Sequence, residues 1–169
     1  MNRKDLERIL RVDQAGEYGA VRIYAGQLAV LGCHKTIQEM ADHEADHLRK
    51  FNQLLIEHKV RPTFFQPLWS IAAYGLGVIS ALGGEKMAHA CTIAVETVID
   101  DHYLEQQHQL DNEPQHAQIA QIVHECHQDE LLHRQTAIEH GGQEAPYFQA
   151  VHTVVTAISK AAIWLSSRF

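Results

Sequence analysis

Two copies of a Glu-x-x-His motif stand out among the residues that can do chemistry. The first copy contains Glu44 and His47, and the second contains Glu130 and His133. A spacing of three residues places both side chains of each pair on one face of a helix. Carboxylate and imidazole groups held in this way are typical metal ligands. Because a single pair is common on helix surfaces, the prediction depends on both copies and on what precedes them.

Each copy is preceded by a glutamate in the helical segment before it. Glu17 is flanked by alanine and glycine, and Glu96 lies within the mainly apolar run 94–99. The chain therefore repeats one order, a glutamate followed by Glu-x-x-His, with 27 residues from the first glutamate to its pair and 34 in the second half.

Burial of these four carboxylates without cations would be very unfavourable. Two divalent metal ions would balance their charge, so the six residues predict a di-iron or di-manganese carboxylate site in a helical bundle. Oxygen-rich ligands with one imidazole per metal leave open positions, which suits iron that binds dioxygen.

A rival motif overlaps the first pair. Residues 43–47 match the H-E-x-x-H signature of zinc proteases, with Glu44 as the general base. That interpretation leaves Glu17, Glu96 and the second Glu-x-x-His pair unexplained, and it supplies no third zinc ligand. We therefore expect His43 to lie on the surface or behind the ligands.

Helical periodicity dominates the chain, and no alternating strand pattern is present. Glycine pairs and prolines mark helix ends, and the expected helices cover residues 3–31, 36–58, 67–82, 85–110, from the turn at 111–114 to about 140, and 146–166. Two long helices, a long connection and two more long helices predict an all-α, ferritin-like four-helix bundle with one crossover. The crossover carries the short apolar helix, the last helix is an extra element, and residues 1–169 suit a single domain.

The composition excludes several classes of protein. The net charge is −7 and no cluster of lysine or arginine is present, so we expect no nucleic-acid partner. The 13 histidines nearly equal the 14 lysines and arginines, which favours metal or proton chemistry. Cys33, Cys91 and Cys126 are far apart and form no C-x-x-C motif, so we expect packing residues in a reducing compartment.

Residues 62–84 form a run of 23 residues without a charged side chain. Prolines and glycines limit its helix to about 22 Å, which is shorter than the ~30 Å hydrocarbon core of a membrane. We expect a monotopic element that enters one leaflet, joined by the C-terminal helix with Lys160 and Arg168 near the headgroups. The alternative is a buried helix of the bundle.

The N-terminal residues carry no pattern of a signal or transit peptide. We therefore expect a peripheral membrane protein on the cytoplasmic face of a bacterial inner membrane. The alternative is a trimmed mitochondrial protein on the matrix face of the inner membrane.

Longer stretches of the sequence resemble the demethoxyubiquinone hydroxylases of ubiquinone biosynthesis. The matching stretches are residues 11–20 (RVDQAGEYGA), 22–27 (RIYAGQ), 46–48 (DHL), 50–52 (KFN), 60–63 (VRPT), 67–69 (PLW), 90–92 (ACT), 94–96 (AVE), 102–103 (HY) and 162–166 (AIWLS). The resemblance covers nearly the whole chain. One departure is Gln14, where many members have histidine, and it affects only the local hydrogen bonding.

The resemblance implies a ferritin-like di-iron monooxygenase. It implies two iron ions held by the same residues that the spacing selects, Glu17, Glu44, His47, Glu96, Glu130 and His133. The implied reaction hydroxylates the ring of demethoxyubiquinone, a polyprenyl benzoquinone, with O2 and electrons from NADH. Because no dinucleotide-binding motif is present, NADH either reduces the quinone at the site or acts through a separate reductase. The resemblance also implies a lipid-binding accessory protein, and a homo-oligomer is a further expectation.

The fold type suggests roles for the four glutamates. We expect Glu44 and Glu130 to bridge the two metals, and Glu17 and Glu96 to be terminal ligands.

Three further residues are candidates for supporting roles. Asp13, four residues before Glu17, is expected either to accept a hydrogen bond from a ligand histidine or to face solvent. Tyr103, seven residues after Glu96, is a candidate electron or proton relay, with a packed bundle tyrosine as the alternative. His102 is a further candidate catalytic residue.

Three other functions fit part of the sequence. A ferroxidase or iron-storage protein uses the same site but needs a hydrophilic exterior, which the uncharged run opposes. A manganese catalase does not explain the apolar helix. A membrane-associated interaction module with an inactive site is opposed by the complete set of six ligands.

Overall fold

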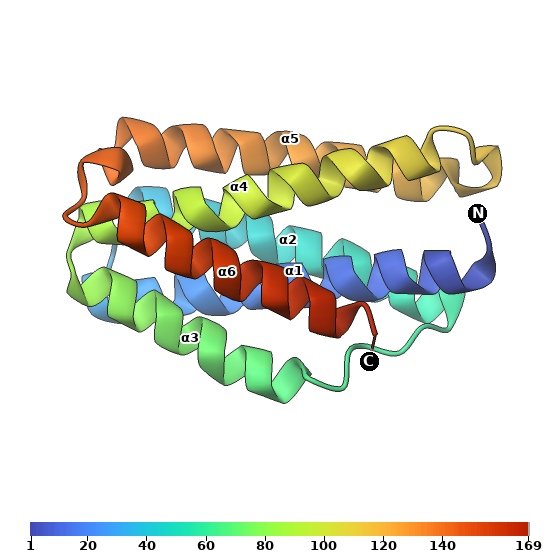
Figure 1. Cartoon of the computed structure of the whole chain (residues 1–169), viewed down its shortest axis with the longest axis horizontal. Coiled ribbons are helices and arrows are strands. Elements are labelled where there is room, and N and C mark those ends of the chain that lie inside the picture. Colours follow the sequence, from blue (N-terminus) through green and yellow to red (C-terminus); the bar gives the residue numbers. More distant parts are fainter. Residues whose placement is uncertain (169) are drawn as a thin grey trace.

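The computed structural model describes residues 1–168, which form six α-helices and no strand (Figure 1). The helices are α1 (Arg3–Leu31), α2 (Lys35–His58), α3 (Gln66–Leu82), α4 (Glu85–Leu110), α5 (Ala117–Glu139) and α6 (Phe148–Ser166). Short 3-10 helices, Pro114–His116 and Gly142–Glu144, precede α5 and α6. The all-α prediction is confirmed, and α6 begins slightly later than expected because Tyr147 adopts a left-handed backbone conformation.

Helices α1, α2, α4 and α5 form the four-helix core. In Figure 1 the chain reverses direction at each connection, so that α1 and α2 form one hairpin and α4 and α5 another. The two hairpins pack together, with α1 in contact with α4 and α2 in contact with α5. Helix α3 carries the crossover between the hairpins along the outside of α1, and α6 packs on α4 and α1.

Two glycines allow α3 to lie close against α1. A Cβ atom on Gly77 of α3 would collide with the carbonyl oxygen of Ile23, and a Cβ atom on Gly26 of α1 would collide with that of Tyr74. The backbones touch at this point, so neither position has room for a side chain. This close approach fixes where the crossover helix sits on the bundle.

Two of the three apolar clusters lie toward opposite ends of the four-helix bundle. Leu10, Phe51 and Val123 belong to the cluster at one end, and Tyr24 and Met40 belong to the cluster at the other. On α1, Glu17 lies between Leu10 and Tyr24 in sequence, and the predicted ligands of α2 and α4 likewise lie between members of these two clusters. The two clusters therefore enclose a polar layer midway along the core.

The outer surface of α3 and α6 is strongly apolar. On α3, Ile71, Ile79 and Leu82 are each at least 70% exposed, and on α6, Val154 and Trp164 are more than half exposed. The alternative of a buried α3 is therefore wrong, because this helix buries only small residues against the bundle. Among the described residues, α6 alone has the length and composition to cross a membrane, a property that core helices of soluble proteins share.

Candidate metal centre

The six side chains selected by their spacing meet inside the four-helix core. Each of them is at most 4% exposed. Helix α1 contributes Glu17, and α4 contributes Glu96. Helices α2 and α5 contribute the Glu-x-x-His pairs, Glu44 with His47 and Glu130 with His133.

These residues form two overlapping groups that are suited to two metal ions. Ligand atoms of Glu17, Glu44, His47 and Glu130 lie within 4.8 Å of one another. The same holds for Glu44, Glu96, Glu130 and His133. Glu44 and Glu130 belong to both groups, which is the arrangement that two bridging carboxylates require.

Both histidines turn one ring nitrogen toward the carboxylates. His47 Nδ1 lies 3.3 Å from Glu130 Oε1, and His133 Nδ1 lies 3.0 Å from Glu44 Oε1. The other nitrogens point away: His47 Nε2 lies 3.0 Å from Asp129 Oδ2, and His133 Nε2 lies 3.1 Å from His43 Nδ1. Metal-binding histidines usually hold their second nitrogen in this way, because the outer contact fixes the orientation of the ring.

The inner atoms of the centre lack hydrogen-bond partners among the described residues. The unpartnered atoms are Glu17 Oε2, both carboxylate oxygens of Glu44, Glu130 Oε2, and Nδ1 of His47 and His133. Unpaired polar atoms at this depth are very unfavourable. Two divalent cations would satisfy these atoms together, so the residues present fit a dinuclear metal site.

Burial and mutual repulsion shape the charges of the centre. Burial, and next the neighbouring carboxylates, raise the pKa of Glu44 and of Glu96 well above the usual range. Burial also opposes ionisation of Glu130, but the nearby imidazoles of His133 and His47 lower its pKa to about 2. The acidic neighbours of both histidines overcome the effect of burial and raise their pKa. Ionisation of Glu44 and Glu96 at neutral pH therefore needs added positive charge, which metal ions would supply.

Two tyrosines contact the glutamates that precede the Glu-x-x-His pairs. The Tyr103 hydroxyl donates a hydrogen bond to Glu17, and the Tyr24 hydroxyl lies 3.4 Å from Glu96 Oε1. Tyr24 was not predicted, although it follows Glu17 by the same seven residues that separate Tyr103 from Glu96. Each tyrosine contacts the glutamate of the other hairpin, so the relation becomes visible only once the helices are paired.

The expectation for Asp13 is wrong in both of its forms. Its side chain is buried rather than solvated, and it contacts Gln106 and His102 instead of a ligand histidine. The outward nitrogens of the ligand histidines face Asp129 and His43 from α5 and α2, whereas Asp13 faces α4. His102 lies 3.3 Å from Asp13 and is part of this outer contact, not of either metal group.

The remaining sequence predictions concern neighbours of the centre. His43 lies behind His133, as expected, and it belongs to no metal group with His47, which removes the basis of the zinc-protease alternative. The Gln14 amide donates a hydrogen bond to Asn52 Oδ1 at 3.1 Å.

The three cysteines were expected to be packing residues. Cys126 is buried, and it also lies beside Glu17 and His47 at the edge of the centre. Of the other cysteines, Cys91 is buried and Cys33 is exposed.

An apolar cavity of about 120 Å3 lies beside the centre, between α1, α3, α4 and α6. Its walls include Gly16 and Val95, the sequence neighbours of Glu17 and Glu96. Other walls come from Trp69 of α3 and from α6, and the Trp69 indole N–H donates a hydrogen bond to Ser166 at 3.1 Å. The cavity therefore extends from the level of the ligands toward the apolar surface of α3 and α6.

Comparison with known proteins identifies relatives of the chain. A Dictyostelium discoideum protein named NADPH-dependent 3-demethoxyubiquinone 3-hydroxylase, mitochondrial, is 47% identical over 99% of this chain and 79% of its own length. The human protein of that name is 42% identical over 99% of this chain and 80% of its own length. A Rhodospirillum rubrum protein named 3-demethoxyubiquinol 3-hydroxylase is 41% identical over 96% of this chain and 78% of its own length.

The family profile described as "Ubiquinone biosynthesis protein COQ7" matches residues 4–166, which include all six candidate ligands. The match spans the four core helices, the crossover helix and α6. With this coverage, and with relatives that are similar over nearly the whole of this chain, the chain belongs to the family of ubiquinone biosynthesis protein COQ7.

Proposed function

We propose that this protein is a di-iron monooxygenase that hydroxylates the ring of demethoxyubiquinone, a late step of ubiquinone biosynthesis. The observation that carries the proposal is the pair of buried ligand groups that share Glu44 and Glu130. The hydroxylase names of relatives at 41% to 47% identity support the substrate. A ferroxidase would use similar ligands, but the exposed apolar surface of α3 and α6 does not suit a hydrophilic storage protein.

Iron is the metal that the donor set suits best. Four carboxylates with one imidazole per ion form an oxygen-rich site, which favours iron or manganese over zinc. Two ferrous ions bound here would supply two electrons for the reduction of dioxygen. In this proposal Glu17 and His47 hold one ion, Glu96 and His133 hold the other, and the two shared glutamates bridge them.

The surrounding residues orient the ligands and handle protons. Asp129 and His43 hold the outer nitrogens of His47 and His133, so the inner nitrogens stay directed at the metals. We assign Tyr103 as a relay residue, because its hydroxyl proton lies on the hydrogen bond to the terminal ligand Glu17. Burial, and next the charge of Glu17, raise the pKa of Tyr103, so the hydroxyl keeps its proton at neutral pH.

The apolar cavity is the proposed route for the quinone. Its walls of glycine, alanine and branched apolar residues suit an uncharged ring and the first part of a polyprenyl tail. The cavity is small, so the remainder of the tail would stay in lipid. This requires the surface of α3 and α6 to face a membrane.

We accordingly propose that the protein binds one membrane leaflet through α3 and α6. Exposed apolar residues on both helices, with Phe64 and Tyr147 at their N-terminal sides, favour such a surface. The surface is also where a lipid-binding accessory protein or a second copy of the chain would compete with lipid. The relatives include a protein named as mitochondrial and a bacterial protein, so the proposed location is the inner membrane of a mitochondrion or of a bacterium.

Product formation by the iron-loaded protein tests this function. The protein would be given O2 and a short-tailed demethoxyquinone with NADH or NADPH, since the Dictyostelium and human relatives are named as NADPH-dependent. We expect hydroxylated product from the wild type and from Glu105→Gln, an exposed control on the same helix as Glu96. Glu96→Gln should lose iron and product together. Undiminished product from Glu96→Gln would contradict the proposed ligand set.

A further inference from the structure

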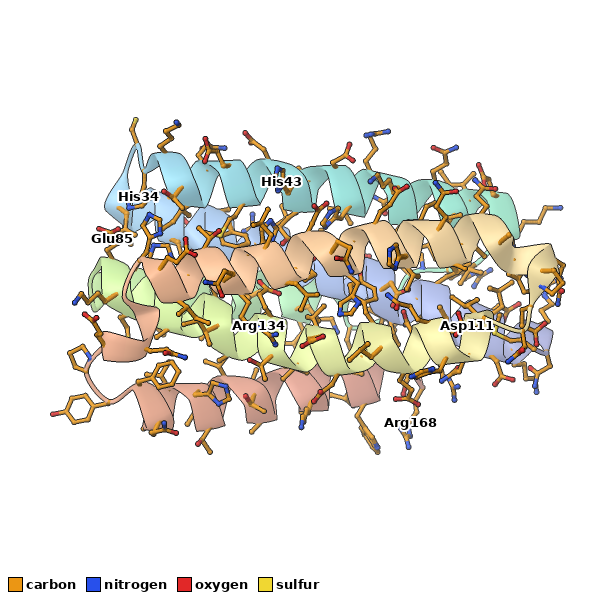
Figure 2. The ribbon with its side chains drawn as sticks, turned by 90° about the horizontal axis from the view of Figure 1, so that it is seen from above. His34, His43, Glu85, Asp111, Arg134 and Arg168 are labelled. Atoms are coloured by element: carbon orange, nitrogen blue, oxygen red, sulfur yellow. The ribbon has the colours of Figure 1, made fainter. Side chains whose placement is uncertain are left out.

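A second group of metal-ligating residues lies at the end of the molecule where α1 ends and α4 begins. Ligand atoms of His34, Glu85 and His89 lie within 4.8 Å of one another. Figure 2 shows His34 and Glu85 next to each other at that end. His89 precedes Glu96 on α4 by two helical turns, roughly 10 Å along the axis. The group is therefore distinct from the central pair of ligand groups.

The distances within this group suit a small tetrahedral cation. His34 Nε2 lies 3.1 Å from Glu85 Oε1, and His89 Nε2 lies 3.8 Å from the same oxygen. Ligands at the usual zinc distances of about 2.0–2.2 Å, arranged as a tetrahedron, lie roughly 3.4 Å apart. The observed separations bracket that value, so a cation requires only small side-chain adjustments.

The His89 side chain is a buried polar group without a hydrogen-bond partner among the described residues. Its side chain is completely buried, and neither ring nitrogen has a hydrogen-bond partner among the described residues. An unpaired buried imidazole destabilises a protein, so such a group needs an explanation. A cation bound beside Glu85 would give one ring nitrogen of His89 the partner that it lacks.

The other two ligands connect this buried ring to solvent. The Glu85 side chain is 50% exposed and that of His34 is 21% exposed, so an ion can enter from outside. His140 lies nearby, with a ring-centroid distance of 5.0 Å to His89, but its nitrogens contact Thr36 and the carbonyl of Thr136. Three protein ligands are thus available, and water can fill a fourth position.

We propose that His34, Glu85 and His89 bind a single divalent transition-metal ion of the zinc type. Two imidazoles and one carboxylate are a known zinc ligand set with one open position. The ion would connect the residue before α2 to the first turns of α4, which joins the two hairpins at one end of the bundle. Metal binding at His34 Nε2 moves the ring proton to Nδ1 and so releases its 3.4 Å contact with the amide of Ile37.

Zinc binding by the untagged full-length protein tests the proposal. Equilibrium dialysis against zinc, with metal counted by mass spectrometry, gives the number of ions bound. Any zinc that binds at the central site counts equally in every protein, so each variant is compared with the wild type. We expect His34→Asn and His89→Asn to bind one zinc ion fewer, and Glu85→Gln to weaken this site by at least about tenfold. His124→Asn, an exposed control on α5, should bind as many ions as the wild type.

The variants His34→Asn and Glu85→Gln keep the test valid if substitution of the buried His89 impairs folding. His34 and Glu85 are accessible to solvent, so their substitution leaves the core intact. Circular dichroism would confirm the fold of each variant before zinc is counted. Zinc binding by His34→Asn and Glu85→Gln that matches the wild type in number and affinity would overturn the proposal.

Discussion

At the residue scale, the internal repeat of the chain extends beyond the ligands. Tyr24 follows Glu17 and Tyr103 follows Glu96 by the same interval, and each hydroxyl contacts the glutamate of the other hairpin. The two halves of the centre therefore support each other across the bundle. Tyr103 makes the closer contact, and it is the side chain on which a role in proton movement can be tested.

Substitution of Tyr103 by phenylalanine removes the hydroxyl that donates to Glu17. We expect turnover to fall about tenfold with iron content unchanged, because the ring still fills its buried position and only the proton donor is lost. Turnover and bound iron would be measured on the same samples. Tyr147→Phe, at a position that is 83% exposed, is the matched control. Wild-type turnover in Tyr103→Phe would rule out the relay role.

Metal affinity at the centre should depend on pH. Because burial raises the pKa of Glu44 and Glu96, these carboxyls hold protons that a metal must displace. The sign follows directly: ferrous ion affinity decreases as pH falls, and metal binding at neutral pH releases protons. Anaerobic calorimetry in two buffers of different ionisation enthalpy measures that release. Equal affinity at about pH 6 and about pH 8 would be inconsistent with this account.

The convergence of the six candidate ligands was predictable because a helix converts sequence spacing directly into geometry. The Glu-x-x-His pairs and the preceding glutamates need no knowledge of tertiary structure beyond a shared core. The outer partners were not predictable in the same way. Asp129 and His43 support histidines on another helix, and Asp13 faces α4, so each of these contacts depends on how the helices are paired and rotated.

At the scale of the elements, the close contact between α1 and α3 holds the crossover in place. Gly77 and Gly26 bring the two backbones together, and the same helices form walls of the apolar cavity. The helix boundaries followed from prolines, glycines and periodicity. The face that α3 buries could not be predicted from the sequence, because a helix that is apolar on most sides gives no indication of which side packs against the bundle.

Substitution of Gly77 by alanine should destabilise the protein. The new Cβ atom would collide with the backbone of Ile23, so α3 must move away from α1. We expect the free energy of unfolding to fall by about 1–3 kcal/mol, as for other overpacked positions. Urea denaturation would measure the change.

Gly75→Ala is the matched control within the same helix. A Cβ atom there meets nothing within 4 Å, so alanine should stabilise α3 slightly through its higher helix propensity. Equal effects at the two positions would show that the close contact has no energetic importance.

At the scale of the whole molecule, the side formed by α3 and α6 is more apolar than the rest of the surface. Helices α3 and α6 expose large apolar side chains, and both helices lie on the outside of the four-helix core that contains the candidate ligands (Figure 1). This arrangement places the apolar cavity between the exposed apolar surface and the candidate ligands. The sequence predicted both parts of this surface, the uncharged run and the C-terminal helix. The packing that brings the two helices together, which includes the hydrogen bond from Trp69 to Ser166, depends on tertiary structure.

Charged substitutions on this surface should prevent membrane binding. We expect the double substitution Ile71→Asp with Ile79→Asp to reduce sedimentation with liposomes by about 100-fold, because two exposed apolar side chains no longer enter the lipid. Iron content should be unchanged. Ile56→Asp, at an equally exposed isoleucine on α2, is the control and should bind liposomes normally. Wild-type sedimentation of the double variant would contradict the proposed membrane surface.

The most direct test of the proposed activity is a single turnover under oxygen-18 gas. Diferrous protein would be mixed with a short-tailed demethoxyquinol that has been reduced beforehand, so that the result does not depend on a reductase. Mass spectrometry would then locate the label. We predict one oxygen-18 atom in a new ring hydroxyl group and none in the same reaction with Glu96→Gln. Oxidation of the iron without labelled product, in protein that holds two iron ions per chain, would contradict the hydroxylase function.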